Sequence, residues 1–119
     1  MELLAQINGK KLPENKKAIQ LINKLKSLVY MYDKNAEVIL FGSRARGDWN
    51  EESDWDFLIL TNAEVTENFK QELRNKILDE IEMPLNEAVF IIVKNKIDWE
   101  EEYAVTNIYE SIMEEGIAL

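Results

Sequence analysis

One stretch decides the fold of this chain: Gly42-Ser43-Arg44-Ala45-Arg46-Gly47-Asp48-Trp49-Asn50-Glu51-Glu52-Ser53-Asp54-Trp55-Asp56. Four apolar residues precede it, Val38 to Phe41, and four follow it, Phe57 to Leu60; each run is long enough for a buried strand. The pattern predicts a strand, a Gly-Ser turn, a short polar segment and a second strand that begins with an Asp-x-Asp pair. Because the second strand is apolar on both faces beyond the acids, we expect it inside a covered sheet.

Asp54 and Asp56 are the predicted catalytic and metal-binding residues. Residues two apart in a strand point to the same face, so the two carboxylates project together and Trp55 points to the other face. Neighbouring carboxylates repel each other and are stabilised when a cation lies between them. An all-oxygen site of this kind suits Mg²⁺, which takes further ligands from substrate phosphates.

Gly42 and Ser43 are the predicted phosphate-binding residues. Gly42 lets the backbone turn and approach a ligand, and Ser43 can open a helical turn whose free N–H groups attract phosphate oxygens. An ordinary strand-to-helix turn is the alternative, but the acids that follow favour the phosphate site. Metal and phosphate sites together imply a metal-bound nucleoside triphosphate.

The two arginines of the turn are candidates for the same ligand. Arg44 and Arg46 do not share a helix face, so at most one is expected to reach a phosphate, and we favour Arg44. The alternative is that both are solvated surface charges. Trp49 either packs on the domain or covers the nucleotide, and packing is the favoured interpretation.

The spacing of these residues resembles a known signature. Gly-Ser, ten residues and then Asp-x-Asp is similar to the motif of the DNA polymerase β-like nucleotidyltransferase superfamily. The fuller form, Phe41 to Gly47 followed by Ser53 to Asp56, looks like its small branch, the minimal nucleotidyltransferases (MNT type). The order of elements extends the resemblance loosely from about Glu14 to about Asp98. It implies the nucleotidyltransferase core, two Mg²⁺ ions as cofactors and ATP as donor substrate.

Glu87 is the candidate for a third carboxylate. The superfamily pattern has a third acid on the strand after the long helix, and Glu87 is the only acid on the predicted strand Glu87 to Val93. Many relatives carry Asp there, so this chain departs in residue type but not in charge. A third carboxylate near the pair can hold a second metal ion or accept the proton of the attacking hydroxyl. The alternative is a solvated strand end.

The rest of the chain predicts an α/β fold with a small mixed sheet of three or four strands flanked by helices. Apolar residues at steps of three and four predict one helix from about Glu14 to Tyr32 and another from about Glu64 to Glu82. Two short helices are expected after the third strand, from Asp98 to about Tyr103 and from Ile108 to Glu115. Pro13 suits the start of the first helix, and Asn8-Gly9 is a turn signal.

Composition narrows the classes of function. The 119 residues argue for one domain, 1–119, and the 14 basic and 23 acidic residues give a net charge of −9. An acidic protein binds nucleic acid poorly, which counts against a template-using polymerase. The absence of Cys and His excludes disulfides, zinc-thiolate sites and a histidine base. No membrane span or signal peptide is visible, so a cytoplasmic location is expected.

The function favoured by the sequence is transfer of a nucleoside monophosphate, AMP from Mg·ATP above all, to a hydroxyl. The resemblance further implies a partner, because minimal nucleotidyltransferases are often paired with a HEPN-domain protein as toxin and antitoxin, and some modify that partner. Two alternatives stay open: a small-molecule transferase of the aminoglycoside-modifying kind, which would need a larger acceptor pocket or a homo-oligomer, and a catalytically idle subunit that neutralises a partner sterically.

Overall fold

The computed structural model describes residues 6–7, 10–11, 15–102 and 104–119. Two short strands near the start, β1 (Gln6–Ile7) and β2 (Lys10–Lys11), pair with each other. The remaining elements are, in chain order, α1 (Lys16–Tyr32), β3 (Glu37–Phe41), α2 (Ser43–Arg46), β4 (Trp55–Thr61), α3 (Glu67–Ile77), the π-helical segment η2 (Leu78–Glu82), α4 (Met83–Leu85), β5 (Val89–Asn95), α5 (Lys96–Glu102), α6 (Asn107–Glu115) and β6 (Ile117–Ala118).

The main sheet has four strands in the order β5-β4-β3-β6. Strands β4 and β5 run parallel, while β3 is antiparallel to both β4 and β6. The sheet is therefore mixed, and the predicted α/β fold with three or four strands is confirmed. Its fourth strand, β6, lies beyond the last helix and had no sequence signal of its own, because two residues are too few to show a period.

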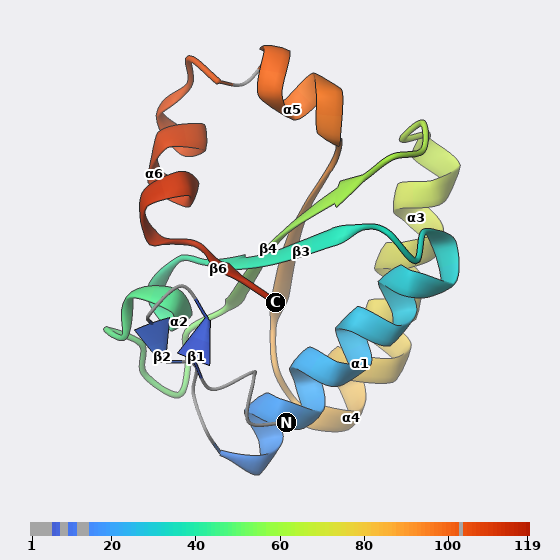
Figure 1. Cartoon of the computed structure of the whole chain (residues 1–119). Helices are drawn as coiled ribbons and strands as arrows, with labels where there is room; N and C mark the ends of the chain where they lie inside the picture. Colours follow the sequence, from blue (N-terminus) through green and yellow to red (C-terminus); the bar gives the residue numbers. More distant parts are fainter. Residues whose placement is uncertain (1–5, 8–9, 12–14, 103) are drawn as a thin grey trace.

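Helices cover the two faces of the sheet separately (Figure 1). Helices α1 and α3 pack on one face, where the buried side chains include Leu25 of α1, Phe57 of β4 and Ile77 of α3. On the other face, Trp99 of α5 and Ile112 of α6 pack against Leu58 and its neighbours. The start of β4 lies between these two layers, so residues on its two faces meet different surroundings. None of the described helices is long and apolar enough to cross a membrane.

The helix boundaries follow side-chain caps. Asn15 accepts a hydrogen bond from the backbone N–H of Ala18 at 2.8 Å and begins α1, and Thr106 does the same for α6. The predicted helix start at Asp98 is wrong, because the side chain of Asn95 accepts hydrogen bonds from the amides of Ile97 and Asp98 and α5 begins at Lys96. The predictions for Pro13 and for the Asn8-Gly9 turn concern residues outside the described part of the chain.

Candidate functional site

The start of β4 positions the two aspartates. Trp55 is 2% exposed and packs in the core on the α1 face, while Asp54 is exposed and Asp56 is half-buried. Because side chains alternate along a strand, Asp56 shares its face with Leu58, which packs against α5 and α6. The structure therefore brings Asp54 and Asp56 together at the end of the sheet, on the side of the C-terminal helices.

Gly42 lies directly against Asp56 of this pair. Its backbone has φ 74° and ψ −160°, a conformation that is essentially restricted to glycine. A Cβ atom at this position would overlap with Oδ2 of Asp56. The carbonyl of Gly42 accepts hydrogen bonds from the amides of Ala45 and Arg46, both at 3.0 Å, which fixes the turn into α2. The turn and the carboxylates thus form one site, with Ser43 half-buried at the first position of α2.

Glu115, the last residue of α6, also belongs to this site. Its Oε1 accepts a hydrogen bond from the backbone N–H of Gly42 at 3.2 Å, and both its oxygens lie 3.3 Å from Nη1 of Arg46. Sequence reasoning missed this residue. Nothing in the local pattern of α6 distinguishes Glu115 from its acidic neighbours, and it meets Gly42 across 73 positions of the chain.

The pKa of Asp56 reflects its burial and the charges around it. Burial raises the pKa of Asp56 above its ordinary value, and the negative charges of Asp54 and Glu115 raise it further. Arg46 opposes the shift. Among the described residues, the three acids of this site outweigh the basic charge of Arg46, which is the electrostatic condition that a divalent cation relieves. Carboxylate oxygens are also the donor atoms that Mg²⁺ prefers, so the residues fit a magnesium ion.

Arg44 lies on the opposite side of β4. Its side chain is 3% exposed, and its guanidinium lies between the rings of Trp49 and Trp55, 4.5 Å from each centroid. Its Nη2 donates a hydrogen bond to the carbonyl of Ser53 at 3.0 Å. Burial lowers the pKa of Arg44, and the charge of Glu87 opposes that shift.

The two arginines are thus placed the other way round from the sequence prediction. Arg44 donates a hydrogen bond to the loop before the aspartates and packs against Trp49. Arg46 lies beside Gly42 and Glu115, on the side of the carboxylate pair. The physical reason is the pair of tryptophans, since a planar cation stacks favourably between two aromatic faces. Of the two arginines, Arg46 is therefore the one on the side of the carboxylate pair.

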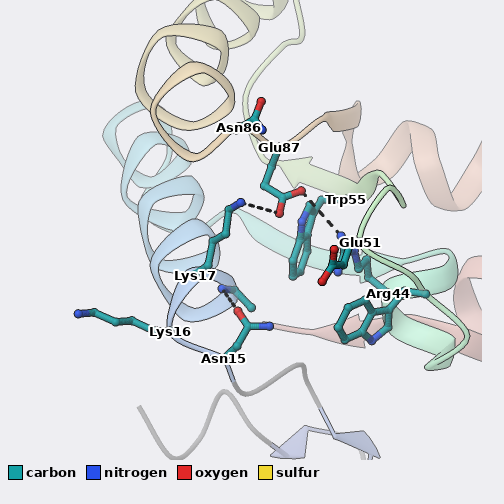
Figure 2. Close-up of a pocket in the computed structure, with 10 residues that line it drawn as sticks. Asn15, Lys16, Lys17, Arg44, Glu51, Trp55, Asn86 and Glu87 are labelled. Atoms are coloured by element: carbon teal, nitrogen blue, oxygen red, sulfur yellow. Dashed lines mark hydrogen bonds and ion pairs between the residues drawn. The ribbon is translucent and has the colours of Figure 1, made fainter.

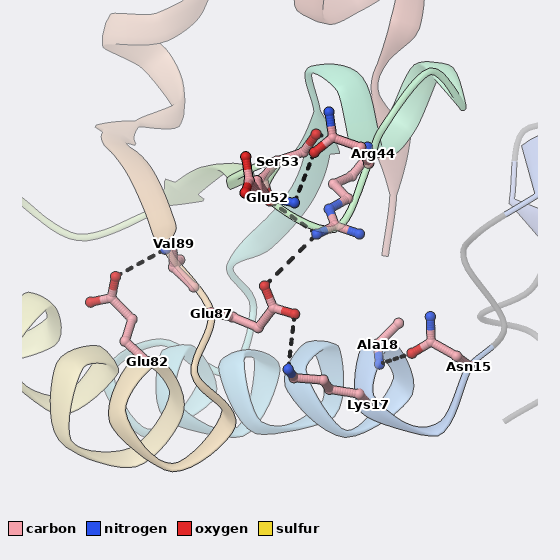
Figure 3. Close-up of polar contacts among 10 residues, drawn as sticks. Asn15, Lys17, Ala18, Arg44, Glu52, Ser53, Glu82, Glu87 and Val89 are labelled. Atoms are coloured by element: carbon pink, nitrogen blue, oxygen red, sulfur yellow. Dashed lines mark hydrogen bonds and ion pairs between the residues drawn. The ribbon is translucent and has the colours of Figure 1, made fainter.

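Glu87 also lies on the Trp55 side. Its Oε1 is 3.2 Å from Nζ of Lys17 and its Oε2 is 3.8 Å from Nη2 of Arg44, so it joins α1 to α2 (Figure 3). In the parallel pairing of β4 with β5, Asp56 is opposite Phe90, which is 51% exposed, and Trp55 is opposite Val89. The predicted strand start at Glu87 is wrong, because β5 begins at Val89 and Glu87 precedes it. Its ion pairs with Lys17 and Arg44 place its carboxylate on the Trp55 side, away from Asp56.

The cluster of three carboxylates expected from the sequence is consequently not formed. Among the described residues, no group of three or more acids is close enough to hold a metal ion. Glu87 instead borders a cavity of about 630 Å³ whose lining includes Lys17, Arg44 and Trp55 but neither aspartate (Figure 2). Asp54 and Asp56 therefore form a pair without Glu87, whose carboxylate contacts Lys17 and Arg44 instead.

We expect Glu87→Gln to lower stability and leave chemistry nearly unchanged. Removing the charge leaves the buried Arg44 without its anionic partner, which costs roughly 1–3 kcal/mol of unfolding free energy. Transfer rates should stay within about tenfold of the native protein, because Glu87 does not face the aspartates.

The measurements are chemical denaturation and nucleotidyl transfer on the same preparations. Glu80→Gln is the matched control, because Glu80 pairs with Lys24 on α1 at an exposed position where an ion pair contributes about 0–1 kcal/mol. A loss of transfer of about 100-fold or more at unchanged stability would place Glu87 in the chemistry after all.

Comparisons with known proteins agree with this geometry. The sequence profile of the nucleotidyltransferase domain family matches residues 18–119. A protein of Methanocaldococcus jannaschii named as protein adenylyltransferase MJ0604 is 33% identical over 108 residues, which covers 89% of this chain and 97% of that protein. A second protein of this organism, named as protein adenylyltransferase MJ0141, is 46% identical over 57 residues, which is 46% of this chain and 58% of that protein, so the match spans less than two thirds of its length.

The fold agrees with solved structures as well. Two crystal structures of mutants of the toxin–antitoxin MntA–HpeT match with TM-scores of 0.56 and 0.57 at 19% and 18% identity. They cover 82% and 81% of this chain and 70% and 69% of those chains, and at this identity they show the shared fold alone. The resemblance drawn from the Gly-Ser and Asp-x-Asp motif is confirmed: the chain belongs to the nucleotidyltransferase domain family and is a nucleotidyltransferase.

Proposed function

We propose that this protein transfers AMP from Mg·ATP to a hydroxyl group of a partner protein. The observation that carries the proposal is the contact between Gly42 and Asp56, which supports a phosphate site next to a metal site. The names of the two Methanocaldococcus proteins support AMP as the transferred group and protein as the acceptor.

Different residues would bind the metal and the phosphates. Asp54 and Asp56 would hold Mg²⁺, which when bound neutralises charge on the triphosphate. Gly42, Ser43 and Arg46 would hold the terminal phosphates through backbone N–H groups and a guanidinium. In the reaction the acceptor oxygen bonds to the α-phosphorus, the bond from that phosphorus to the bridging oxygen of pyrophosphate breaks, and the acceptor hydroxyl releases a proton.

The rigid mounting of the pair supports catalysis over a purely steric role. Asp56 is part of β4, a central strand hydrogen-bonded to β3 and β5, and Arg44 ties the preceding loop to Trp55 beneath it. Most of the rate acceleration in phosphoryl and nucleotidyl transfer comes from positioning and charge stabilisation, both of which require fixed groups.

A HEPN-domain protein is the partner class that we propose. The structural likeness to MntA, which is part of a toxin–antitoxin pair in those crystals, supports a protein partner. Exposed apolar side chains offer it a surface around α5 and α6: Ile97, Val105, Ile108 and Met113. A macromolecular acceptor also agrees with the open position of Asp54, which a small molecule would not require.

The test uses the pure protein, Mg²⁺, a lysate of the source cells and ATP labelled at the α-phosphate, with Asp56→Asn alongside. A labelled protein band that is lost with the variant, and that does not appear with γ-labelled ATP, is the expected result. Parallel reactions with α-labelled GTP, CTP and UTP identify the base.

Other outcomes contradict separate parts of the proposal. Mg²⁺-dependent ATP binding without a labelled protein would point to a small-molecule acceptor. Neither binding nor label with any nucleotide would leave the idle subunit that acts sterically.

A further inference from the structure

The carboxylate of Glu115 occupies donors of the nucleotide site. Its Oε1 takes the hydrogen bond of the Gly42 amide at 3.2 Å, and its two oxygens share Nη1 of Arg46 at 3.3 Å. The first donor belongs to Gly42 itself, which lies against Asp56. A carboxylate on a backbone N–H and a guanidinium presents the same chemistry as a phosphate oxygen in that position.

The two anions cannot use these donors together. A backbone amide has one hydrogen, so the Gly42 N–H binds either Glu115 or a phosphate oxygen. Arg46 can contact Glu115 and a phosphate at the same time, because its side chain is half exposed and already pairs with a second carboxylate, that of Asp48, at 3.3 Å. Any anion that takes the Gly42 amide must therefore displace Glu115 or leave that amide to it.

Glu115 makes these contacts despite electrostatic repulsion from the nearby aspartates. Glu115 adds a third negative group to a site that already contains Asp54 and Asp56. A neutral residue in its place would remove this repulsion towards the phosphates of a nucleotide as well as the competition for the amide.

Packing and strand pairing hold the backbone next to Glu115, so any displacement of the carboxylate must come from rotation of the side chain. Gly116 lies against the carbonyl of Ile112 and the side chain of Ile39, and β6 pairs with β3 immediately afterwards. The glutamate can therefore withdraw by rotation of its own side chain, without displacement of α6. This limits the change to a few torsion angles and makes it compatible with reversible binding.

We propose that Glu115 competes with the nucleotide for the Gly42 amide and Arg46 and thereby sets the affinity for the triphosphate. This inference rests on the proposed function, because it assigns phosphate to that turn. Glu115 is then a residue that weakens binding in the ground state, the reverse of what is expected from an acid that holds the metal.

The test compares dissociation constants of the native protein, Glu115→Gln and Glu115→Ala. The probes are Mg·ATP and Mg·pyrophosphate, measured by calorimetry at one ionic strength. We expect binding of both probes to tighten in the order native, Gln, Ala, with about a tenfold gain for Ala, since a fractionally occupied site loses affinity in proportion.

Glu110→Gln is the matched control, because it removes the same charge from an exposed position of the same helix. It should leave both constants within about twofold of the native values, which separates the local contact from a general effect of net charge. Melting temperatures of all variants verify that each is folded.

Three results would contradict the proposal. Unchanged or weaker binding by Glu115→Ala, with native binding and transfer intact, overturns the inference and leaves the proposed function standing. Weaker Mg²⁺-dependent binding by Glu115→Gln together with lost transfer would make Glu115 a metal-site residue and overturn it also. No binding and no transfer in any variant would remove the proposed function and this inference with it.

Discussion

Asp56→Asn is expected to abolish nucleotidyl transfer and at the same time to stabilise the ligand-free protein. The loss follows from the position of the carboxylate, which lies against Gly42 and near Asp54 and is one of the two carboxylates that we propose as ligands of Mg²⁺. Loss of a group that fixes the charge-stabilising metal costs on the order of 10³-fold or more in rate. Asparagine keeps the size of the side chain, so the effect reports charge.

The gain in stability follows from the pKa of the same group. Burial, Asp54 and Glu115 raise the pKa of Asp56 in the folded protein above its value in the unfolded chain. The folded state therefore binds the proton more tightly, and the resulting stability is fully present below the unfolded pKa and is lost as pH rises through the folded pKa. Near neutral pH the ionised Asp56 destabilises the fold, and a neutral asparagine removes that penalty.

Thermal unfolding against pH, with and without Mg²⁺, measures the second effect. The melting temperature of Asp56→Asn should exceed the native value at neutral pH, and the gap should close as the pH is lowered through the folded pKa of Asp56. Mg²⁺ should raise the melting temperature of the native protein and not that of the variant. Asp79→Asn, an exposed acid of η2, serves as control. A lower melting temperature for Asp56→Asn would contradict the electrostatic account.

Most of the fold could be predicted because the elements are long and periodic. Helix α1 shows one apolar stripe and ends at Tyr32 as predicted, while its start at Lys16 differs from the predicted Glu14 by about a residue or two, the usual disagreement at helix ends. Strands β3 and β4 were predicted from two uninterrupted apolar runs on either side of one turn. The region after Glu64 was less regular, since the predicted single helix starts at Glu67 and continues through η2 into α4.

The site was only partly predictable, and the reason is register. The Asp-x-Asp spacing places Asp54 and Asp56 on one face wherever the strand lies, so this part is local. Which face of β5 meets them depends on how β4 and β5 align, and a shift of one residue exchanges the faces. The observed alignment puts Phe90 beside Asp56. Glu87 precedes β5 and pairs with Arg44 instead.

Charge alone also says little about the partner that a side chain will find. Arg44 and Arg46 are two residues apart and equally basic, yet one is buried between tryptophans and the other lies at the open turn. The loop that brings Trp49 over Arg44 decides this, and no spacing rule describes such a loop. Glu115 arrives from the far end of the chain and is visible only once α6 is packed on the sheet.

Gly42→Ala is expected to damage both stability and function severely. Its φ of 74° with ψ of −160° lies in a region where a residue with a Cβ costs about 1–3 kcal/mol. The new methyl group would also overlap with Oδ2 of Asp56, so the carboxylate must move away from its position beside Asp54. Together these effects should lower the unfolding free energy by about 2–4 kcal/mol and nucleotidyl transfer by on the order of 10²-fold or more.

Gly47→Ala separates the strain from the displacement of Asp56. Gly47 ends α2 with φ 96° and ψ −1°, and a Cβ atom there meets open space. Alanine in a left-handed conformation costs roughly 1–2 kcal/mol, so this variant should lose stability while transfer stays near the native rate. If both glycine variants lose transfer in proportion to their loss of stability, strain in the turn accounts for the effect. If only Gly42→Ala loses transfer when both are assayed well below their melting temperatures, the close approach of the turn to Asp56 is what the chemistry requires.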